Sequence, residues 1–403
     1  MSLAPTGTDA SVNVPRQRSA TEGDPVPASP RPERFGVRAA WPAVALYAGL
    51  RLVCLAVAWA YAASSGKDLW ALLGKYDAIW YAGIVERGYD AAIPLRPDGG
   101  LATTNLAFFP LFPGLTAALD PIVPGGAGSA GIVASWLAGL AAAWGLFAVG
   151  AHVRDRRTGI LLAGVWAVLP HAFVESMGYT ETLFTALAAW SLFALLRRRW
   201  LTAGLLCLLA GLTRPTGAAI IAVVGLAALI AVIRRRDGWR PWLAAFLAPL
   251  GFLGYVAWVG DRLGRADGYF HVQNDAWRMG YDLGGYTVST TSGLLTKSSP
   301  LALYMVVLVL LIAVTLLVAV ATDRRVPWEL TVYALLIVGL AFFGDSYFNS
   351  KARLLIPAFP LLLPVAAALA SARRTVMVAV LTLLTLISAS YGVYLGLTWT
   401  YSP

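Results

Sequence analysis

Residues 75–89 read KYDAIWYAGIVERGY and follow the first apolar run that is long enough to cross a membrane. Two basic and two acidic side chains lie too close together in this stretch for it to enter hydrocarbon. Its aromatic and charged residues suit an amphipathic helix in the membrane interface, with Gly88 as its C-terminal stop. We therefore expect this helix to hold the Asp77 carboxylate at the boundary between water and lipid.

The composition indicates an all-α polytopic membrane protein. Hydrophobic residues make up 58% of the 403 and charged residues only 13%, about half the charged share of a soluble domain. The formal charge of +10 does not indicate nucleic acid, because the arginines form short clusters between apolar runs, as in cytoplasmic loops. Cys54 and Cys207 both lie inside apolar runs, so we expect no disulfide framework.

The first 37 residues are rich in Pro, Ser, Arg and acidic residues and contain no apolar block. They cannot bury enough surface to offset the entropy of ordering, so we expect a disordered cytoplasmic tail at 1–37. The absence of an apolar core in this tail also argues against a cleavable signal peptide. The rest of the chain, 38–403, is expected to form one membrane module.

Eleven apolar runs are candidate spans: 41–62, 129–150, 158–174, 178–196, 200–213, 216–233, 241–260, 300–321, 327–344, 353–371 and 374–397. A further run, NLAFFPLFPGLTAALD at 105–120, is kept out of the membrane, because all later arginine clusters then share the side of the tail. That arrangement puts 19 of the 31 basic residues inside and 11 outside, with Arg51 in the first span. We therefore predict eleven spans with the C-terminus outside.

Two long outer segments remain, at about 63–128 and 261–299. The first contains the interfacial helix and the NLAFFPLFP run, whose two prolines favour a bent element that does not cross. We find no inverted repeat between the halves of the chain, and a secondary transporter would often have one.

Five motifs resemble, in order, those of the PIG-V-like mannosyltransferases. They are YDAIWYAGIVERGYD, NLAFFPLFPGL, ESMGYTETLF, GLTRPTG and KARLLIPAFPLLLP, and they run from about residue 75 to residue 364. Tyr76 stands where that family usually has Trp before the Asp. The arginine-rich loops and the Ala, Gly and Leu bias look like those of an actinobacterial member.

The resemblance implies a GT-C fold, with about eleven transmembrane helices and interfacial helices in the first outer loop. Such enzymes transfer a sugar from a polyprenyl-phosphate donor on the outer face and invert the anomeric centre. The resemblance makes Asp77 the expected general base and mannose the expected sugar. The alternative interpretation of Asp77 is a solvated or capping carboxylate on an interfacial helix.

Most basic residues are predicted to lie on the cytoplasmic side. Arg214, Lys351 and Arg353 are exceptions, because they stand at the predicted outer ends of helices. We expect them to bind the donor phosphate, for which Arg offers a two-pronged contact and Lys a point charge. The alternative is that they extend to the interface as membrane anchors.

Several other outer residues suit binding of a sugar or an acceptor: Trp80, Tyr81, Tyr179, Glu181 and Asp345. The aromatic side chains could equally form a membrane-interface belt, and Glu181 could simply open its helix. The three histidines are scattered and show no ligand spacing, so we expect neither a metal nor a cofactor.

The partners expected are therefore a polyprenyl-phosphate-sugar donor, a glycolipid or glycoprotein acceptor and the lipid bilayer. Two other functions remain open. A related GT-C enzyme could use arabinofuranose or glucose, and a lipid or solute transporter would move its substrate unchanged. The transporter is disfavoured because the spans carry few charged residues.

Overall fold

Helices make up the regular structure of the described chain, in which only two isolated β-bridges interrupt the pattern. The computed structural model describes residues 1, 2, 4 and 35–403, and residues 35–403 form one unit. The all-α prediction is therefore confirmed for these residues. The prediction of disorder at 1–37 falls almost entirely outside the described residues.

Among the described residues, five helical segments are long and apolar enough to cross a membrane. They are α1 (Val37–Ser64), α5 (Gly126–Val153), the α10–α11 segment (Arg240–Arg262), α14 (Leu301–Thr322) and α18 (Arg374–Leu397). A sixth consists of Phe348–Leu354 and Phe359–Ser371, which meet at a 70° bend. The protein is thus a multi-pass membrane protein.

The other predicted spans are helical but short. They correspond to α6 (Arg156–Ala167), α7 (Glu181–Leu196), α8 (Trp200–Gly211), α9 (Gly217–Ile233) and α15 (Trp328–Phe343). None reaches the roughly 20 residues that a perpendicular helix needs to cross the hydrocarbon. The total of eleven spans therefore stays a prediction.

Helix α5 lies at the centre of the bundle and packs against α1, α3, α4, α6 and α7. Small residues allow this close packing, which is typical of helix contacts in membranes. A Cβ atom on Gly159 of α6, for example, would lie 2.5 Å from the Phe147 carbonyl oxygen of α5. The centre of the bundle is thus set by backbone contact as well as by apolar side chains.

The arginine clusters that separate the apolar runs meet at one end of the bundle. Arg154 pairs with Asp323, and Arg157 donates to the Ala372 carbonyl at 3.3 Å. Arg198 pairs with Asp237 at 2.8 Å. The Phe35 ring contacts both Arg197 and His152 and so links these two groups of loops on one side of the bundle, as the charge pattern predicts.

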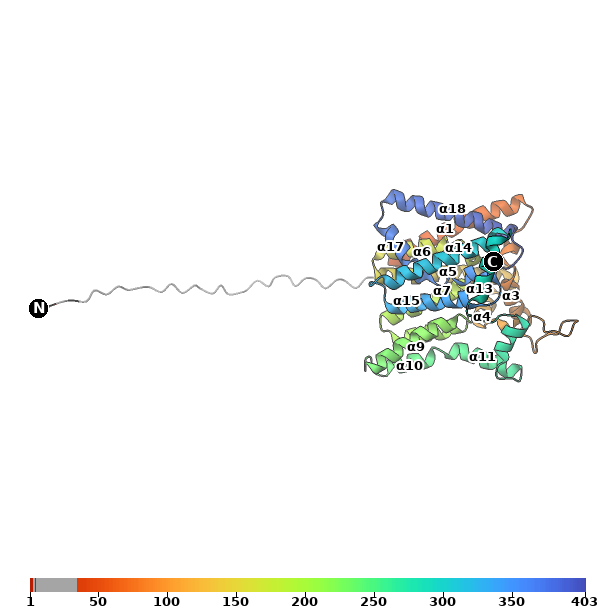
Figure 1. Cartoon of the computed structure of the whole chain (residues 1–403), viewed down its shortest axis with the longest axis horizontal. Helices are drawn as coiled ribbons and strands as arrows, with labels where there is room; N and C mark the ends of the chain where they lie inside the picture. The colour runs from red at the N-terminus through yellow and green to blue at the C-terminus, as the bar shows by residue number, and fades with distance from the viewer. Residues whose placement is uncertain (3, 5–34) are drawn as a thin grey trace. The chain divides into compact units, whose positions relative to one another are not determined.

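The short helices of the first outer segment are α2 (Leu69–Leu73), α3 (Asp77–Arg87) and α4 (Leu111–Leu119). Helix α3 confirms the helix predicted in 75–89, and Gly88 ends it with a φ of +77°. Helix α4 has nine residues, about 14 Å of helix, so the run at 105–120 does not span. Figure 1 shows α3 and α13 (Gly285–Thr296) near one end of residues 35–403, where the C-terminal residue also lies.

The two outer segments pack together into one platform, formed by residues 75–112 and 262–286. Trp277 contacts the rings of Trp80 and Phe108, and its indole N–H donates to the Thr104 carbonyl at 3.0 Å. Arg262 donates to the carbonyls of residues 89 and 90. The first segment is thereby fixed by the second.

Candidate active site

Four charged side chains from separate parts of the chain meet beside the platform. Arg353 Nη1 lies 2.8 Å from Asp77 Oδ2, and its Nε lies 3.9 Å from Glu181 Oε1. Arg214 Nη1 lies 3.0 Å from the same Glu181 oxygen. We call Asp77, Arg353, Glu181 and Arg214 the charge cluster.

Helix ends position the members of this cluster. Asp77 is the first residue of α3 and Glu181 the first residue of α7, where a carboxylate is favoured by the helix dipole. Arg353 lies in α16 (Lys351–Leu354), next to the bend of the broken span, and Arg214 follows α8. Glu181 and Arg214 thus stand at or just beyond the ends of the short apolar helices α7 and α8.

Burial differs across the cluster. The side chain of Glu181 is 2% exposed and that of Arg353 is 12% exposed, whereas that of Asp77 is 25% exposed. The cluster has two carboxylates and two guanidiniums, so its formal charge is zero. Asp77 is the member that a substrate can reach most easily.

Two tyrosines border Asp77. The Arg353 guanidinium lies over the Tyr179 ring at 5.1 Å, and the Tyr179 hydroxyl lies 3.4 Å from the Asp77 amide nitrogen. The Tyr81 hydroxyl lies 3.4 Å from Thr180 Oγ1, and burial raises the pKa of Tyr81. The Tyr81 phenol therefore stays protonated at neutral pH.

Lys351 stands apart from the charge cluster. Its side chain is 1% exposed, and its ammonium donates to the Ala341 carbonyl at 3.0 Å and to the Gly344 carbonyl at 2.5 Å. These are carbonyls at the C-terminal end of α15. The structure thus gives Lys351 backbone partners in place of the open position that phosphate binding would require.

The remaining predicted residues line the surroundings. Trp80 stacks on Phe108 with ring centroids 5.7 Å apart and contacts Trp277. Asp345 accepts a hydrogen bond from the Gly280 amide at 2.6 Å. Trp80 therefore belongs to the platform, and Asp345 ties the second outer segment to the loop after α15.

An outer cavity of about 580 Å³ lies beside the platform. The side chains that matter for its chemistry are Arg96, Trp277, Arg278, Tyr286, Asp345 and Tyr347. Burial and the Asp77 charge raise the pKa of Tyr347, and the Arg278 charge lowers it. Tyr347 lines the cavity and is therefore within range of the charges of both Asp77 and Arg278.

Sequence reasoning missed Arg96 and Arg278. Both lie in the long outer segments, where no helical periodicity or motif singles them out. The available signal was their outer location, which departs from the inside bias of the arginine clusters.

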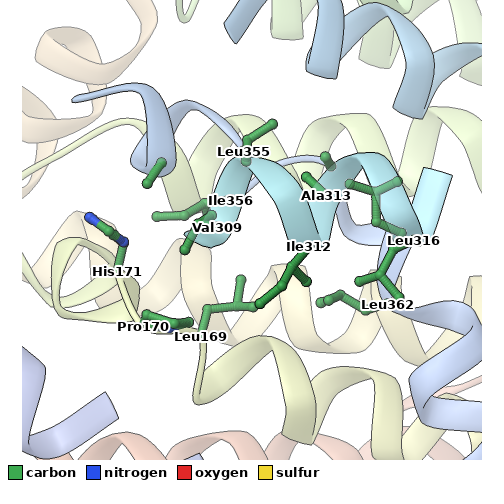
Figure 2. Close-up of a pocket in the computed structure, with 13 residues that line it drawn as sticks. Leu169, Pro170, His171, Val309, Ile312, Ala313, Leu316, Leu355, Ile356 and Leu362 are labelled. Atoms are coloured by element: carbon green, nitrogen blue, oxygen red, sulfur yellow. The ribbon is translucent and has the colours of Figure 1, made fainter. Parts of the chain in front are cut away.

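A second cavity, of about 70 Å³, is apolar (Figure 2). Residues of α14, among them Val309, Ile312 and Leu316, form one wall, and Ala352 and Leu355 flank Arg353 on another. His171 is the titratable side chain in the lining. An apolar void of this kind stays dry and suits hydrocarbon.

Metal ligands do not gather in the described part of the chain, which contains no group of three or more His, Cys, Asp or Glu side chains placed to hold an ion.

No protein-family model matches the chain, and no curated protein matches it. The crystal structure of ArnT from Cupriavidus metallidurans bound to undecaprenyl phosphate is similar at a TM-score of 0.49 and 14% identity, over 86% of this chain and 75% of that one. A similarity this weak does not indicate a function. The resemblance to PIG-V-like enzymes therefore rests on the five motifs alone.

Proposed function

We propose that this protein is an integral-membrane glycosyltransferase with a GT-C-like fold that uses a polyprenyl-phosphate sugar as donor. The observation that carries the proposal is the Asp77 carboxylate, which is partly exposed and paired with Arg353 at 2.8 Å, on a helix whose Trp80 contacts Trp277 of the outer cavity. An ionisable group kept at the edge of an apolar bundle favours chemistry over structure. The ordered motifs support the same class.

Asp77 acts as the general base in this reaction. The acceptor hydroxyl gives its proton to the Asp77 carboxylate while its oxygen forms a bond to the anomeric carbon. The bond from that carbon to the phosphate oxygen breaks, and the electron pair leaves with the polyprenyl phosphate. Arg353 and the Tyr179 hydroxyl hold the helix end that carries Asp77 in position.

The donor sugar is mannose, which rests on the motif resemblance. Arabinofuranose and glucose are the alternatives within the same class. The acceptor is a glycolipid or glycoprotein. The apolar cavity beside Arg353 is large enough for a few methylene groups and supports a lipid-borne substrate.

The active site faces outward in this proposal. The arginine clusters meet at one end of the bundle, and the charge cluster lies at helix ends away from these clusters. Basic loops favour the cytoplasmic side. The N-terminus is therefore cytoplasmic, and transfer occurs on the extracytoplasmic face of the cell membrane.

The test is incubation of purified protein with a panel of polyprenyl-phosphate sugars and acceptors, with polyprenyl phosphate release as the readout. Asp77→Asn should abolish release, a loss of at least about a hundredfold, while the variant still binds donor. Glu86→Gln is the matched control, because Glu86 lies on the same helix, is 53% exposed and, within the described residues, pairs only with Arg87. Near-normal turnover by Asp77→Asn would remove Asp77 from the mechanism.

A transporter is the second candidate, favoured by the 70° bend between the two halves of the last broken span. Interrupted helices often form substrate sites in transporters. The same assay in sealed vesicles separates the two functions. Movement of intact donor across the membrane without release of polyprenyl phosphate would support the transporter and contradict the enzyme.

A further inference from the structure

The charge cluster has no positive charge to spare for a phosphate. Arg353 faces Asp77 and Glu181, and Arg214 faces Glu181, so two cations balance two carboxylates. Lys351 is occupied by two carbonyls. The two paired guanidiniums therefore add little net attraction for an anionic donor, and Lys351, although it keeps its charge, directs its ammonium to the backbone.

The geometry of an inverting reaction also argues against a phosphate site at Arg353. In an inverting displacement, the base and the leaving group stand on opposite faces of the sugar. Arg353 touches Asp77, so it stands on the face of the base. The leaving phosphate needs a cation on the far side of the sugar from Asp77.

The outer cavity contains two arginines, Arg96 and Arg278, that are not members of the charge cluster. Among the residues that the structure describes, neither Arg278 nor Arg96 forms an ion pair, and Arg96 uses only its Nε, which donates to the Leu101 carbonyl at 2.7 Å. One carboxylate, Asp345, lines the same cavity, and its Oδ1 accepts from the Gly280 amide. The cavity lining thus carries a formal charge of +1.

We infer that the outer cavity is the binding site for the phosphate of an isoprenoid phosphate, held by Arg278 and Arg96 opposite Asp77. This inference rests on the proposed function, whose donor it places. The sugar then lies between these guanidiniums and the charge cluster, against Trp277 and Tyr347. Guanidinium groups suit phosphate because they offer paired N–H donors.

Two features prepare the site. Arg278 and Tyr347 both have left-handed backbone conformations, with φ values of +54° and +46°, which are unusual for side-chain-bearing residues. The Tyr347 hydroxyl donates to the Trp277 carbonyl at 3.1 Å and joins the two loops. The loops are therefore held in conformations that present these side chains to the cavity.

An apolar surface beside the cavity suits the isoprenoid chain. Tyr286, which lines the cavity, belongs to α13, and this region exposes Leu283, Val288 and Leu295 at 85%, 59% and 82%. Exposed aliphatic side chains on a short outer helix fit the membrane interface. A lipid can thus keep its chain in the bilayer and its phosphate in the cavity.

The test measures binding of decaprenyl phosphate and of decaprenol to the purified full chain in nanodiscs of zwitterionic lipid. The ratio of the two affinities isolates the phosphate. Arg278→Gln should reduce that ratio about tenfold or more, and Arg278→Lys should restore part of it. Arg265→Gln is the control, because Arg265 lies in the same outer segment, outside the cavity, paired with Asp267. The wild-type ratio should also fall as salt rises.

Three results would overturn the inference. The first is an unchanged ratio in both Arg278→Gln and the Arg96→Gln/Arg278→Gln double variant. The second is equal competition by inorganic phosphate or by phosphatidylglycerol, which would make the cavity a general anion or headgroup site. The third is an Arg278-dependent preference for hexose 6-phosphate or glucuronate as acceptor without any change in decaprenyl phosphate binding, which would assign the cavity to the acceptor.

Failure of the inference and failure of the proposed function have different signatures. If Arg278→Gln loses phosphate binding but the wild-type protein releases polyprenyl phosphate from no donor in the panel, the phosphate site is supported and the glycosyltransferase function is contradicted. If sugar transfer proceeds in Arg278→Gln with an unchanged donor KM, the enzyme stands and the site falls.

Discussion

At the scale of single residues, the charged side chains near the site fall into two groups. Glu181 is 2% exposed and faces two guanidiniums, so the removal of either cation would leave a buried carboxylate less well compensated. Asp77 is more open and touches one of the same guanidiniums. Glu181 is thus held between the two guanidiniums, and Asp77 is the more accessible of the two carboxylates.

Lys351 provides a residue-scale prediction, because its ammonium holds two carbonyls at the end of α15. Lys351→Met should lower the free energy of unfolding by about 1.5–3 kcal/mol through the loss of these charge-assisted hydrogen bonds. It should leave the donor KM unchanged, because the ammonium does not reach the phosphate. Unfolding in detergent and initial-rate kinetics measure the two effects.

Lys297→Met is the control for this variant, since Lys297 is exposed and should change stability by less than about 0.5 kcal/mol. If Lys351→Met has normal stability but a raised donor KM, Lys351 binds the donor phosphate. Its hydrogen bonds to the α15 carbonyls would then not be its main role.

The sequence allowed the site's residue types to be predicted, but it did not determine how they would pair. Asp77, Glu181, Arg214 and Arg353 stand out because they are charged residues at the mouths of apolar helices. Their pairing depends on how four separate elements approach one another, which no local pattern encodes. The backbone partners of Lys351 lie 7 and 10 residues upstream, across the break after α15, and could not be seen without that break.

At the scale of elements, the placement of α3 depends on a close contact with Gly178. A Cβ atom at this position would lie 3.1 Å from Ala78 Cβ, next to Asp77, and 3.6 Å from the backbone of α5. The loop before α7 therefore touches both the helix that carries Asp77 and the central helix. The position of α3, and with it that of Asp77, therefore depends on how the loop packs against α5.

Gly178→Ala should consequently shift the start of α3 by a few tenths of an ångström. We expect kcat to fall about tenfold, because small misplacements of a catalytic group are costly. The unfolding free energy should fall by about 1 kcal/mol, the lower range for added core volume. Kinetics with a saturating donor and unfolding curves measure both.

Gly128→Ala in α5 is the matched substitution, because its Cβ would meet no atom of the described residues within 4 Å. It should leave turnover unchanged. Full activity in Gly178→Ala would mean that α3 has room to adjust, and the rigid placement of Asp77 would have to be abandoned.

Element types were predictable, while element lengths were less so. Each of the eleven apolar runs contains helix, since apolar runs in a bilayer must satisfy their own backbone hydrogen bonds. The lengths of α7 and α8 depend on where the chain turns to bring Glu181 and Arg214 together. The 70° bend of the broken span falls at residues 355–358, which include Pro357, a residue that interrupts helical hydrogen bonding.

At the scale of the whole molecule, the described unit has a polarity. Arginine-rich loops join one set of helix ends, and the platform, the charge cluster and the outer cavity belong to the others. A bilayer with a cytoplasmic preference for Arg should orient this unit in one way. Orientation is therefore a property that can be tested without any substrate.

The final prediction uses cysteine labelling in intact cells. The two native cysteines, Cys54 and Cys207, are 6% and 0% exposed, so they should react slowly and give little background. Glu86→Cys on α3 should react with a membrane-impermeant maleimide. Arg236→Cys, in the basic loop after α9, should react only after permeabilisation, because positive loops stay inside. Labelling of position 236 but not of position 86 in intact cells would reverse the orientation and place the proposed reaction on the cytoplasmic face.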